Sequence, residues 1–387
     1  MTNESPPDTR QPVAARRQMD YLCLQPTREG QASYVHVNEI VAGMRRRGWR
    51  VRLIEPSQPQ LDRLDGIRRA GAVAVAQLRY WVHCRFRPAR VVYIRSHFAA
   101  LPTAALARAA GSTVVQEVNG DVRDAFDLWP ALRRFSRLLA LSARTQLRWA
   151  DAVITVTDGL AEYVESLTGR GDKCHVVGNG ANVELFRPSP QSANPAGRPY
   201  VVFVGALASW QGIDVLLQAV ASPEWPAHIH LVIIGDGRER ERVVSASRSN
   251  PNVRWLGAIP HREVGALVSA SLAALVPTTD RGRTRPAPSP VKLYEAMASG
   301  VPVIASDIAG VGDVVQAHDC GVVFPAGDPK ALARLVSELA ADLERAHLMG
   351  ARGRSAAVEL YSWDVRARQT EHVILKALDD KAKRTRA

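Results

Sequence analysis

The 387-residue sequence contains only four cysteines, and neither a CxxC pair nor a histidine at zinc-ligand spacing accompanies them. A cysteine-based zinc site is therefore not indicated. We expect buried free thiols at the four positions, which are Cys23, Cys84, Cys174 and Cys320.

Long apolar runs are also missing. The nearest candidate, AGAVAVA at residues 70–76, is far shorter than the roughly 18 apolar residues that a membrane span needs. The first 17 residues are polar and proline-rich and lack the apolar core of a signal peptide. We therefore expect a cytoplasmic protein that is attached peripherally at the inner face of the cell membrane.

Acidic residues are scarce in the first part of the chain. Residues 1–150 hold 24 Lys and Arg against 12 Asp and Glu, whereas residues 151–387 hold 26 against 26, so the whole net charge of +12 lies in the first part. This asymmetry predicts an anionic partner for residues 1–150: a membrane surface, a phosphorylated acceptor or nucleic acid. Nucleic acid is disfavoured, because the aromatic residues lie in helix-like segments and no RNA- or DNA-reading motif is present.

What the sequence does contain is a repeated alternation of continuous apolar strands with amphipathic helices. Such strands are buried on both faces, which is typical of a doubly wound parallel α/β sheet. In the first part of the chain they are YLCLQ, VRLIEP, VVYI, TVVQEV, AVITV and HVV, and in the second YVVFVG, HLVIIGDG, VRWLG, LAALVP, VPVIAS and GVVF.

The proline- and serine-rich stretch near residue 190 interrupts this alternation and predicts a boundary between two domains. Because ligands bind at the carboxyl ends of parallel strands, the cleft between two such domains is the expected site. We divide the chain into a disordered tail (1–18), a Rossmann-like acceptor-binding domain (19–190), a linker (191–198), a second Rossmann-like domain (199–361) and a C-terminal helix crossing back to the first domain (362–387).

The stretch SPVKLYEAMASGVPVIAS at residues 289–306 carries the strongest chemical signal. Ser289 and Pro290 are good N-cap and N1 residues, so a helix with free N–H groups should begin there and attract a phosphate or diphosphate. Lys292 would add a charge-assisted hydrogen bond, and Glu295, one turn further, would accept hydrogen bonds from a ribose. The alternative is a surface Lys–Glu pair on an ordinary capped helix.

This stretch resembles the signature of retaining family-4 glycosyltransferases with the GT-B fold, in which two Rossmann-like domains face each other across a cleft. Further segments resemble the family in the expected order, from about residue 20 to 375. They are REGQASYVHVNEIVAGMRRRGWRV (28–51), ADAVITVTDGLAEYV (150–164), VVGNGANVELFRP (176–188), FVGALASWQGIDVLLQA (203–219), LVIIGDGRERERV (231–243) and VRWLGAIPHREVGALVSASLAALVPT (253–278).

The resemblance implies a role for each matching position. Asn119, Lys292 and Glu295 would be the catalytic residues, Glu295 by holding the nucleotide ribose. Residues binding the nucleotide sugar would be Gly30, Gln31, Gly205, Gln211, Leu256, Gly257, Ala258, Arg285, Ser289, Pro290, Val291 and Leu293, together with Lys292 and Glu295. The GDG segment at 235–237 is better read as a tight turn after a strand.

Three positions depart from the family pattern. Ala287 stands where a second glutamate usually contacts the donor sugar, Gln211 replaces a lysine that faces the diphosphate, and Asn119 stands where a histidine is often found. Arg283, Arg285 and Lys292 are placed to offset the lost lysine. No Asp-x-Asp motif stands where a metal-binding sugar transferase needs one, and PTREGQAS lacks the GxGxxG dinucleotide pattern. We therefore expect no metal ion and no cofactor.

Two segments of the basic half, residues 67–90 and 129–149, mix arginine with Trp, Phe and Leu at helical spacing. Both fit a helix lying on anionic lipid, and the alternative is packing on the protein's own sheet with the arginines in solvent.

We predict a glycosyltransferase that moves a hexose from a nucleotide diphosphate sugar to a lipid-linked or polysaccharide acceptor. The alternative is a degenerate relative that holds a nucleotide sugar or a partner transferase without turnover.

Overall fold

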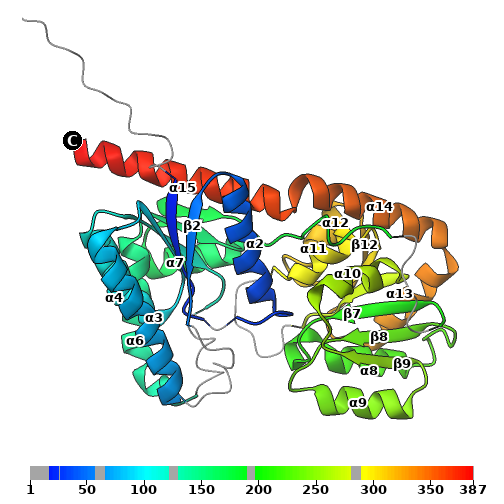
Figure 1. Ribbon diagram of the computed structural model, residues 1–387. Helices are drawn as coiled ribbons and strands as arrows, with labels where there is room; N and C mark the ends of the chain where they lie inside the picture. The colour runs from blue at the N-terminus through cyan, green and yellow to red at the C-terminus, as the bar shows by residue number, and fades with distance from the viewer. Residues whose placement is uncertain are drawn as a thin grey trace, which may run out of the picture.

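Two parallel six-stranded sheets form the core of two domains (Figure 1). The computed structural model describes residues 17–25, 27–56, 66–121, 130–189, 197–279 and 289–386. The strand order is β2-β1-β3-β4-β5-β6 in the first sheet and β12-β11-β10-β7-β8-β9 in the second, and every pairing is parallel. The predicted α/β class with two doubly wound sheets is confirmed.

All the predicted strands are present. The first sheet holds β1 (Gln18–Leu22), β2 (Arg50–Ile54), β3 (Val91–Arg95), β4 (Thr113–Val118), β5 (Ala152–Thr155) and β6 (Cys174–Val176). The second holds β7 (Tyr200–Val204), β8 (His230–Ile234), β9 (Val253–Gly257), β10 (Ala273–Val276), β11 (Val303–Ser306) and β12 (Gly321–Phe324).

Strand β1 begins three residues before the predicted segment YLCLQ, within the stretch expected as tail. Met19 is buried, and Asp20 is 4% exposed because it forms an ion pair with Arg52 of β2. Sequence patterning missed this start, because a carboxylate so close to a strand's beginning reads as loop.

Helices cover both faces of each sheet. In the first domain they are α2 (Ala32–Arg46), α3 (Gly66–Phe86), α4 (Leu101–Ala109), α6 (Ser136–Trp149) and α7 (Asp158–Thr168), with short 3-10 turns at Phe98–Ala100, Pro130–Phe135 and Gly171–Lys173. In the second they are α8 (Ile213–Val220), α9 (Arg240–Ser249), α10 (His261–Ser269), α11 (Val291–Ala298), α12 (Gly312–Ala317), α13 (Pro329–Ala341) and α14 (Leu343–Leu360), with a 3-10 turn at Ser209–Gln211.

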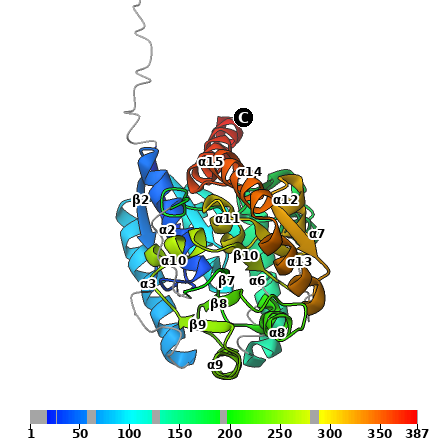
Figure 2. The ribbon, with the colours of Figure 1, turned by 90° about the vertical axis from the view of Figure 1, so that its right-hand side faces the viewer.

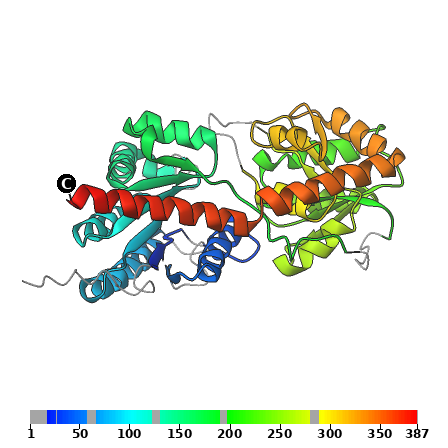
Figure 3. The ribbon, with the colours of Figure 1, turned by 90° about the horizontal axis from the view of Figure 1, so that it is seen from above.

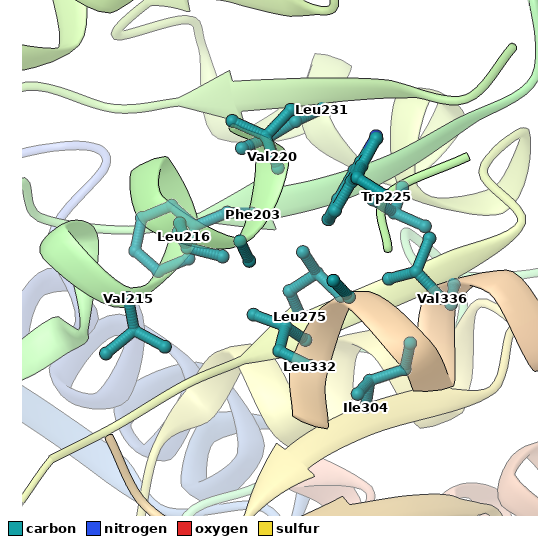
Figure 4. Close-up of a cluster of buried hydrophobic side chains, with 14 of the residues drawn as sticks. Phe203, Val215, Leu216, Val220, Trp225, Leu231, Leu275, Ile304, Leu332 and Val336 are labelled. Atoms are coloured by element: carbon teal, nitrogen blue, oxygen red, sulfur yellow. The ribbon is translucent and has the colours of Figure 1, made fainter. Parts of the chain in front are cut away.

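The core of the second domain lies between its sheet and the helices α8 and α13. Figure 4 shows Phe203 and Leu275 of the strands packed with Leu216 of α8 and Leu332 of α13. All four side chains are at most 1% exposed, so this face of the sheet is closed to ligands. A second cluster of buried side chains covers the other face, so we expect the residues that contact a ligand to lie at the strand ends.

The last helix, α15 (Trp363–Arg386), returns from the second domain to the first. Figures 2 and 3 show α14 and α15 following each other along one side of the molecule, with α15 over the first domain. It packs against α2, β4 and β5, and Trp363, 1% exposed, joins the first domain's core.

The chain crosses between the domains twice, and the two crossings touch. Ala181 N–H donates to Tyr361 O (2.8 Å), and Trp363 N–H donates to Ala181 O (3.0 Å). A side chain on Gly180 would place its Cβ 2.5 Å from Tyr361 O, so only glycine permits this approach. The crossings therefore form a compact junction between the domains.

The four cysteines are free thiols: three are buried, but Cys174 is half-exposed at the edge strand β6, in contrast to the prediction. Within the described ranges, no helix is long and apolar enough to cross a membrane.

Candidate functional site

Helix α11 starts beside the first domain. Its N-cap is Pro290 and its first residue is Val291, one position later than predicted. The Oγ of Ser289 does not cap the helix, because it accepts a hydrogen bond from Asn179 N–H (3.3 Å). The start of the helix is thus held by the crossing segment.

Three predicted residues meet at the carboxyl end of β7. Lys292 Nζ donates to Gln211 Oε1 (2.7 Å) and lies 4.0 Å from the centroid of the Phe203 ring. Gly205 makes room for this ammonium, because a Cβ there would lie 3.1 Å from Nζ. The ammonium of Lys292 therefore lies next to the side chain of residue 211, where the family pattern carries a lysine.

Burial disfavours the charged form of Lys292 and lowers its pKa to about 7, although the nearby Glu295 acts in the opposite direction. The charged and neutral forms of Lys292 are therefore both populated near pH 7, and an anion bound beside Nζ would favour the charged form.

Glu295 lies one helical turn further along and is 6% exposed. Its Oε1 lies 2.7 Å from Nε2 of His261, the first residue of α10. Burial disfavours protonation of the imidazole, but the hydrogen bond and the charge of Glu295 outweigh it, so the pKa of His261 is raised. Sequence reasoning missed His261 because a lone histidine after a proline carries no signal without its partner.

The strand ends of the second sheet are linked by backbone contacts between glycines. Gly235 N–H donates to Gly257 O (2.8 Å), and a Cβ on Gly235 would lie 1.9 Å from Gly205 O. The GDG segment thus lets two loops pack closely, which agrees with its interpretation as a tight turn after a strand. The N–H of Gly205 donates to Ile234 O (3.0 Å), so the lack of a side chain at Gly205 is what opens space beside Lys292.

Other predicted positions contribute less to an open site. Leu293 is fully buried in the second domain's core and its N–H donates to Pro290 O, so the structure contradicts its assignment as a ligand contact. The side chain of Val291, 5% exposed, packs in the first domain's core, so a contact of Val291 to a ligand would come from its backbone. Leu256 is half-buried, and Ala258 is exposed after β9. Arg283, Arg285 and Ala287 lie outside the described residues.

In the first domain, Gly30 and Gln31 are exposed at the start of α2. Gly30 has a φ of +85° and open space where a side chain would project. Its neighbour Glu29 lies near enough to act electrostatically on His261, so this loop faces the second domain.

Asn119 follows β4 and donates its amide to Glu117 Oε1. Glu117, 1% exposed, also accepts hydrogen bonds from Tyr93 Oη (2.5 Å) and Arg95 (2.8 Å), and its Oε2 lies 3.0 Å from His36 Nε2. Burial alone would raise the pKa of this carboxyl, but the surrounding donors lower it well below its usual range. A carboxylate inside the apolar strand TVVQEV was the available signal for this cluster.

Within the described part of the chain, no three His, Cys, Asp or Glu side chains gather as metal ligands.

The chain forms two Rossmann-like domains that are joined by a double crossing, and a helix begins between them. This arrangement defines the GT-B class of fold. The family described as glycosyl transferases group 1 matches residues 187–356, and the glycosyl transferase 4-like domain matches residues 32–180. The chain therefore belongs to the GT-B glycosyltransferases built from these two domains.

Two sequence relatives and one solved structure agree with this family assignment. A GDP-mannose-dependent alpha-mannosyltransferase of Mycobacterium tuberculosis is 34% identical over 45% of this chain and 46% of its own length. A phosphatidyl-myo-inositol mannosyltransferase of Mycobacterium leprae is 26% identical over 87% of this chain and 91% of its own length. Sucrose-phosphate synthase from Thermosynechococcus elongatus superposes with a TM-score of 0.76, at 18% identity, over 94% of this chain and 100% of that chain, which shows the shared fold.

The chain spans about half the length of the first of these relatives. Other curated relatives match it over 54% to 65% of their own length.

Proposed function

We propose that the protein transfers a hexose from a nucleotide diphosphate sugar to a lipid-linked or polysaccharide acceptor, with retention at the anomeric carbon and without a metal ion. The single observation that carries this proposal is the meeting of Lys292, Gln211 and Gly205 at one strand end, with Glu295 one turn away. The names of the two mycobacterial mannosyltransferases support a hexose donor and an acceptor of the glycolipid class.

The diphosphate would bind at Lys292, whose Nζ turns from Gln211 toward the phosphate oxygens. A charge-assisted hydrogen bond of this kind contributes about 1.5–3 kcal/mol. Glu295 would receive a ribose hydroxyl on Oε2, because Oε1 is already engaged by His261. His261 thus orients the carboxylate for the nucleotide.

The acceptor hydroxyl would attack the anomeric carbon from the face that the diphosphate leaves. One bond forms between the acceptor oxygen and the anomeric carbon, the bond from that carbon to the phosphate oxygen breaks, and the departing diphosphate takes the hydroxyl proton. Lys292 stabilises the negative charge that develops on the leaving group. Asn119, at the end of β4, is the first domain's polar group toward the acceptor.

We also propose that the first domain rests on an anionic membrane surface. Exposed apolar side chains on α3 and α6 support this, and α4 contacts both of these helices at the end of the first domain away from the second (Figure 1). The arginines of α6, which are Arg137, Arg144 and Arg148, are exposed as well. The apolar residues are Val75, Leu78 and Val82 on α3, and Leu138, Leu141 and Trp149 on α6.

The proposal is tested first by thermal-shift screening with UDP-, GDP- and ADP-sugars and then by transfer and hydrolysis assays with the donor that binds. Replacing Glu295 by Ala removes charge-assisted hydrogen bonds to the ribose, so the free energy of nucleotide binding should weaken by about 1–3 kcal/mol. The matched control is Glu263→Ala, whose exposed carboxylate lies on α10 and should leave affinity within about twofold.

Unchanged affinity in Glu295→Ala would contradict the assigned site. Binding of a nucleotide without transfer or hydrolysis from any donor would instead identify the degenerate binding module, for which Ala287 and the uncharged Gln211 are the sequence argument.

A further inference from the structure

We infer that Asn179, in the first crossing between the domains, is a positioning residue that aligns the start of α11 with the acceptor side of the site. This inference rests on the proposed transferase function. It is carried by a continuous series of polar contacts from Asn119 in the first domain to Ser289 in the second.

The series begins at the buried Glu117, which receives the amide of Asn119 and lies 3.0 Å from His36 Nε2. The other ring nitrogen, Nδ1, lies 2.7 Å from Asn179 Oδ1. His36 is 4% exposed and packs edge-on against Trp363 of α15 at 5.3 Å between ring centroids, so the ring cannot easily rotate away.

Asn179 uses all of its polar groups at this point. Its Nδ2 donates to Ser289 O (2.5 Å), its backbone N–H donates to Ser289 Oγ (3.3 Å), and its carbonyl accepts from Arg366 Nε (2.9 Å). Because Ser289 O can only accept, Nδ2 must face it, and Oδ1 must therefore face His36. The ring then donates from Nδ1 to the amide, and it faces an acceptor-only carboxylate at Nε2.

An amide supplies a donor and an acceptor on one short planar group, whereas an ionised carboxylate of the same size supplies acceptors alone. Asn179 therefore joins α2, the loop before α11 and α15 at a single residue. The loop before α11 leads directly to Lys292 and Glu295, so its position relative to Asn119 sets the distance between the donor side and the acceptor side of the site. A misplacement of about 1 Å in such a geometry lowers the rate by about 100-fold.

Asn182, three residues later in the same crossing, offers a matched control. Its Nδ2 donates to Glu39 Oε1 of α2 (2.8 Å), while its Oδ1 accepts from the N–H groups of Glu184 and Leu185. The change Asn182→Asp keeps the two acceptor contacts and loses the link to Glu39. It removes one contact to α2 without touching the series from Glu117 to Ser289.

The test compares Asn179→Asp with Asn182→Asp. An aspartate at 179 keeps the acceptor for His36 but places an oxygen against Ser289 O. We expect kcat for transfer to fall 10- to 100-fold in Asn179→Asp. The Kd for the nucleoside diphosphate should stay within twofold, because Lys292 and Glu295, the residues proposed to hold the diphosphate and the ribose, both belong to the second domain. Asn182→Asp should retain both values.

Hydrogen–deuterium exchange gives a readout that does not depend on turnover. Backbone amides of residues 293–296, which are the first hydrogen-bonded amides of α11, should exchange faster in Asn179→Asp than in the unmodified protein, and Asn182→Asp should show no such change. If the unmodified protein transfers no sugar, the proposed function fails and exchange alone decides the inference. Unchanged kcat in Asn179→Asp, an equal loss of kcat and nucleotide affinity, or unchanged exchange where turnover is absent would overturn it.

Discussion

At the scale of a single residue, Lys292 is the side chain whose ionisation the fold changes and on which the proposed diphosphate site depends. Its ammonium contacts an amide oxygen and an aromatic ring, and burial lowers its pKa to about 7. In the unfolded chain a lysine titrates near 10.5. Between these values the unfolded state binds more protons than the folded state, so the destabilisation due to Lys292 is full below pH 7 and is relieved as pH rises.

A bound diphosphate reverses this situation, because its negative charge favours the ammonium and raises the pKa of Lys292. We therefore predict that nucleoside diphosphate binding at pH 8 takes up a proton, to a limit of about one per site. Above pH 7, affinity should fall by at most about tenfold per pH unit. Titration calorimetry in buffers of different ionisation enthalpy measures the uptake.

The variant Lys292→Met should bind without proton uptake, whereas Lys330→Met, which removes an exposed lysine on α13, should behave like the unmodified protein. Equal uptake by Lys292→Met and the unmodified protein would show that another group takes the proton.

At the scale of elements, two ion pairs hold α15 against the C-terminal end of α2, and they differ in how deeply they are buried. Glu371 is 4% exposed, forms an ion pair with Arg47, and accepts from Trp49 Nε1 (2.9 Å). Asp364 pairs with Arg46 at 3.0 Å, but both side chains are more than half exposed. Both pairs join an arginine to a carboxylate within hydrogen-bonding distance, so we expect burial to decide how much each contributes to stability.

We predict that Glu371→Ala lowers the free energy of unfolding by about 2–4 kcal/mol, because it leaves a buried indole N–H and a guanidinium without their acceptor. Asp364→Ala should cost less than about 1 kcal/mol, because solvent screens its exposed pair. Urea denaturation followed by tryptophan fluorescence measures both. Similar losses in the two variants would mean that the exposed pair matters as much as the buried one.

At the scale of the whole molecule, charge and exposed apolar surface coincide. The excess of basic residues lies within residues 1–150, and the exposed leucines of α6 lie in the same region. Leu138 is 64% exposed and Leu141 59%, so nothing within the described protein covers them. An anionic bilayer would bury the leucines and attract the neighbouring arginines.

We predict that the protein sediments with vesicles of anionic lipid at low salt but not with neutral vesicles. Leu138→Glu combined with Leu141→Glu should lower the partition coefficient at least tenfold, since each leucine contributes about 1.5–3 kcal/mol when fully buried. Leu343→Glu with Leu348→Glu is the matched control, because these leucines are 55% and 54% exposed on α14 of the second domain. Equal recovery with both vesicle types, or equal loss in both double variants, would refute the membrane proposal.

The strands of both sheets were predictable because parallel strands buried on both faces carry continuous apolar runs. The start of β1 was not, because Asp20 is accommodated only through Arg52 on the neighbouring strand. In the site, Lys292 and Glu295 were found from local spacing on one helix. Their partners Gln211 and His261 lie 81 and 34 residues away in the chain, and the pairing His261–Glu295 had no local signal.

The sequence by itself determined the alternation of strands and helices, the boundary between two domains, the family and the unequal distribution of charge, since each follows from residues close together in the chain. Tertiary structure alone decided which carboxylates are buried, which amide joins the domains, and that Lys292 contacts Gln211. These features depend on contacts between distant segments, whose energies arise from burial and hydrogen-bond geometry that no local pattern records.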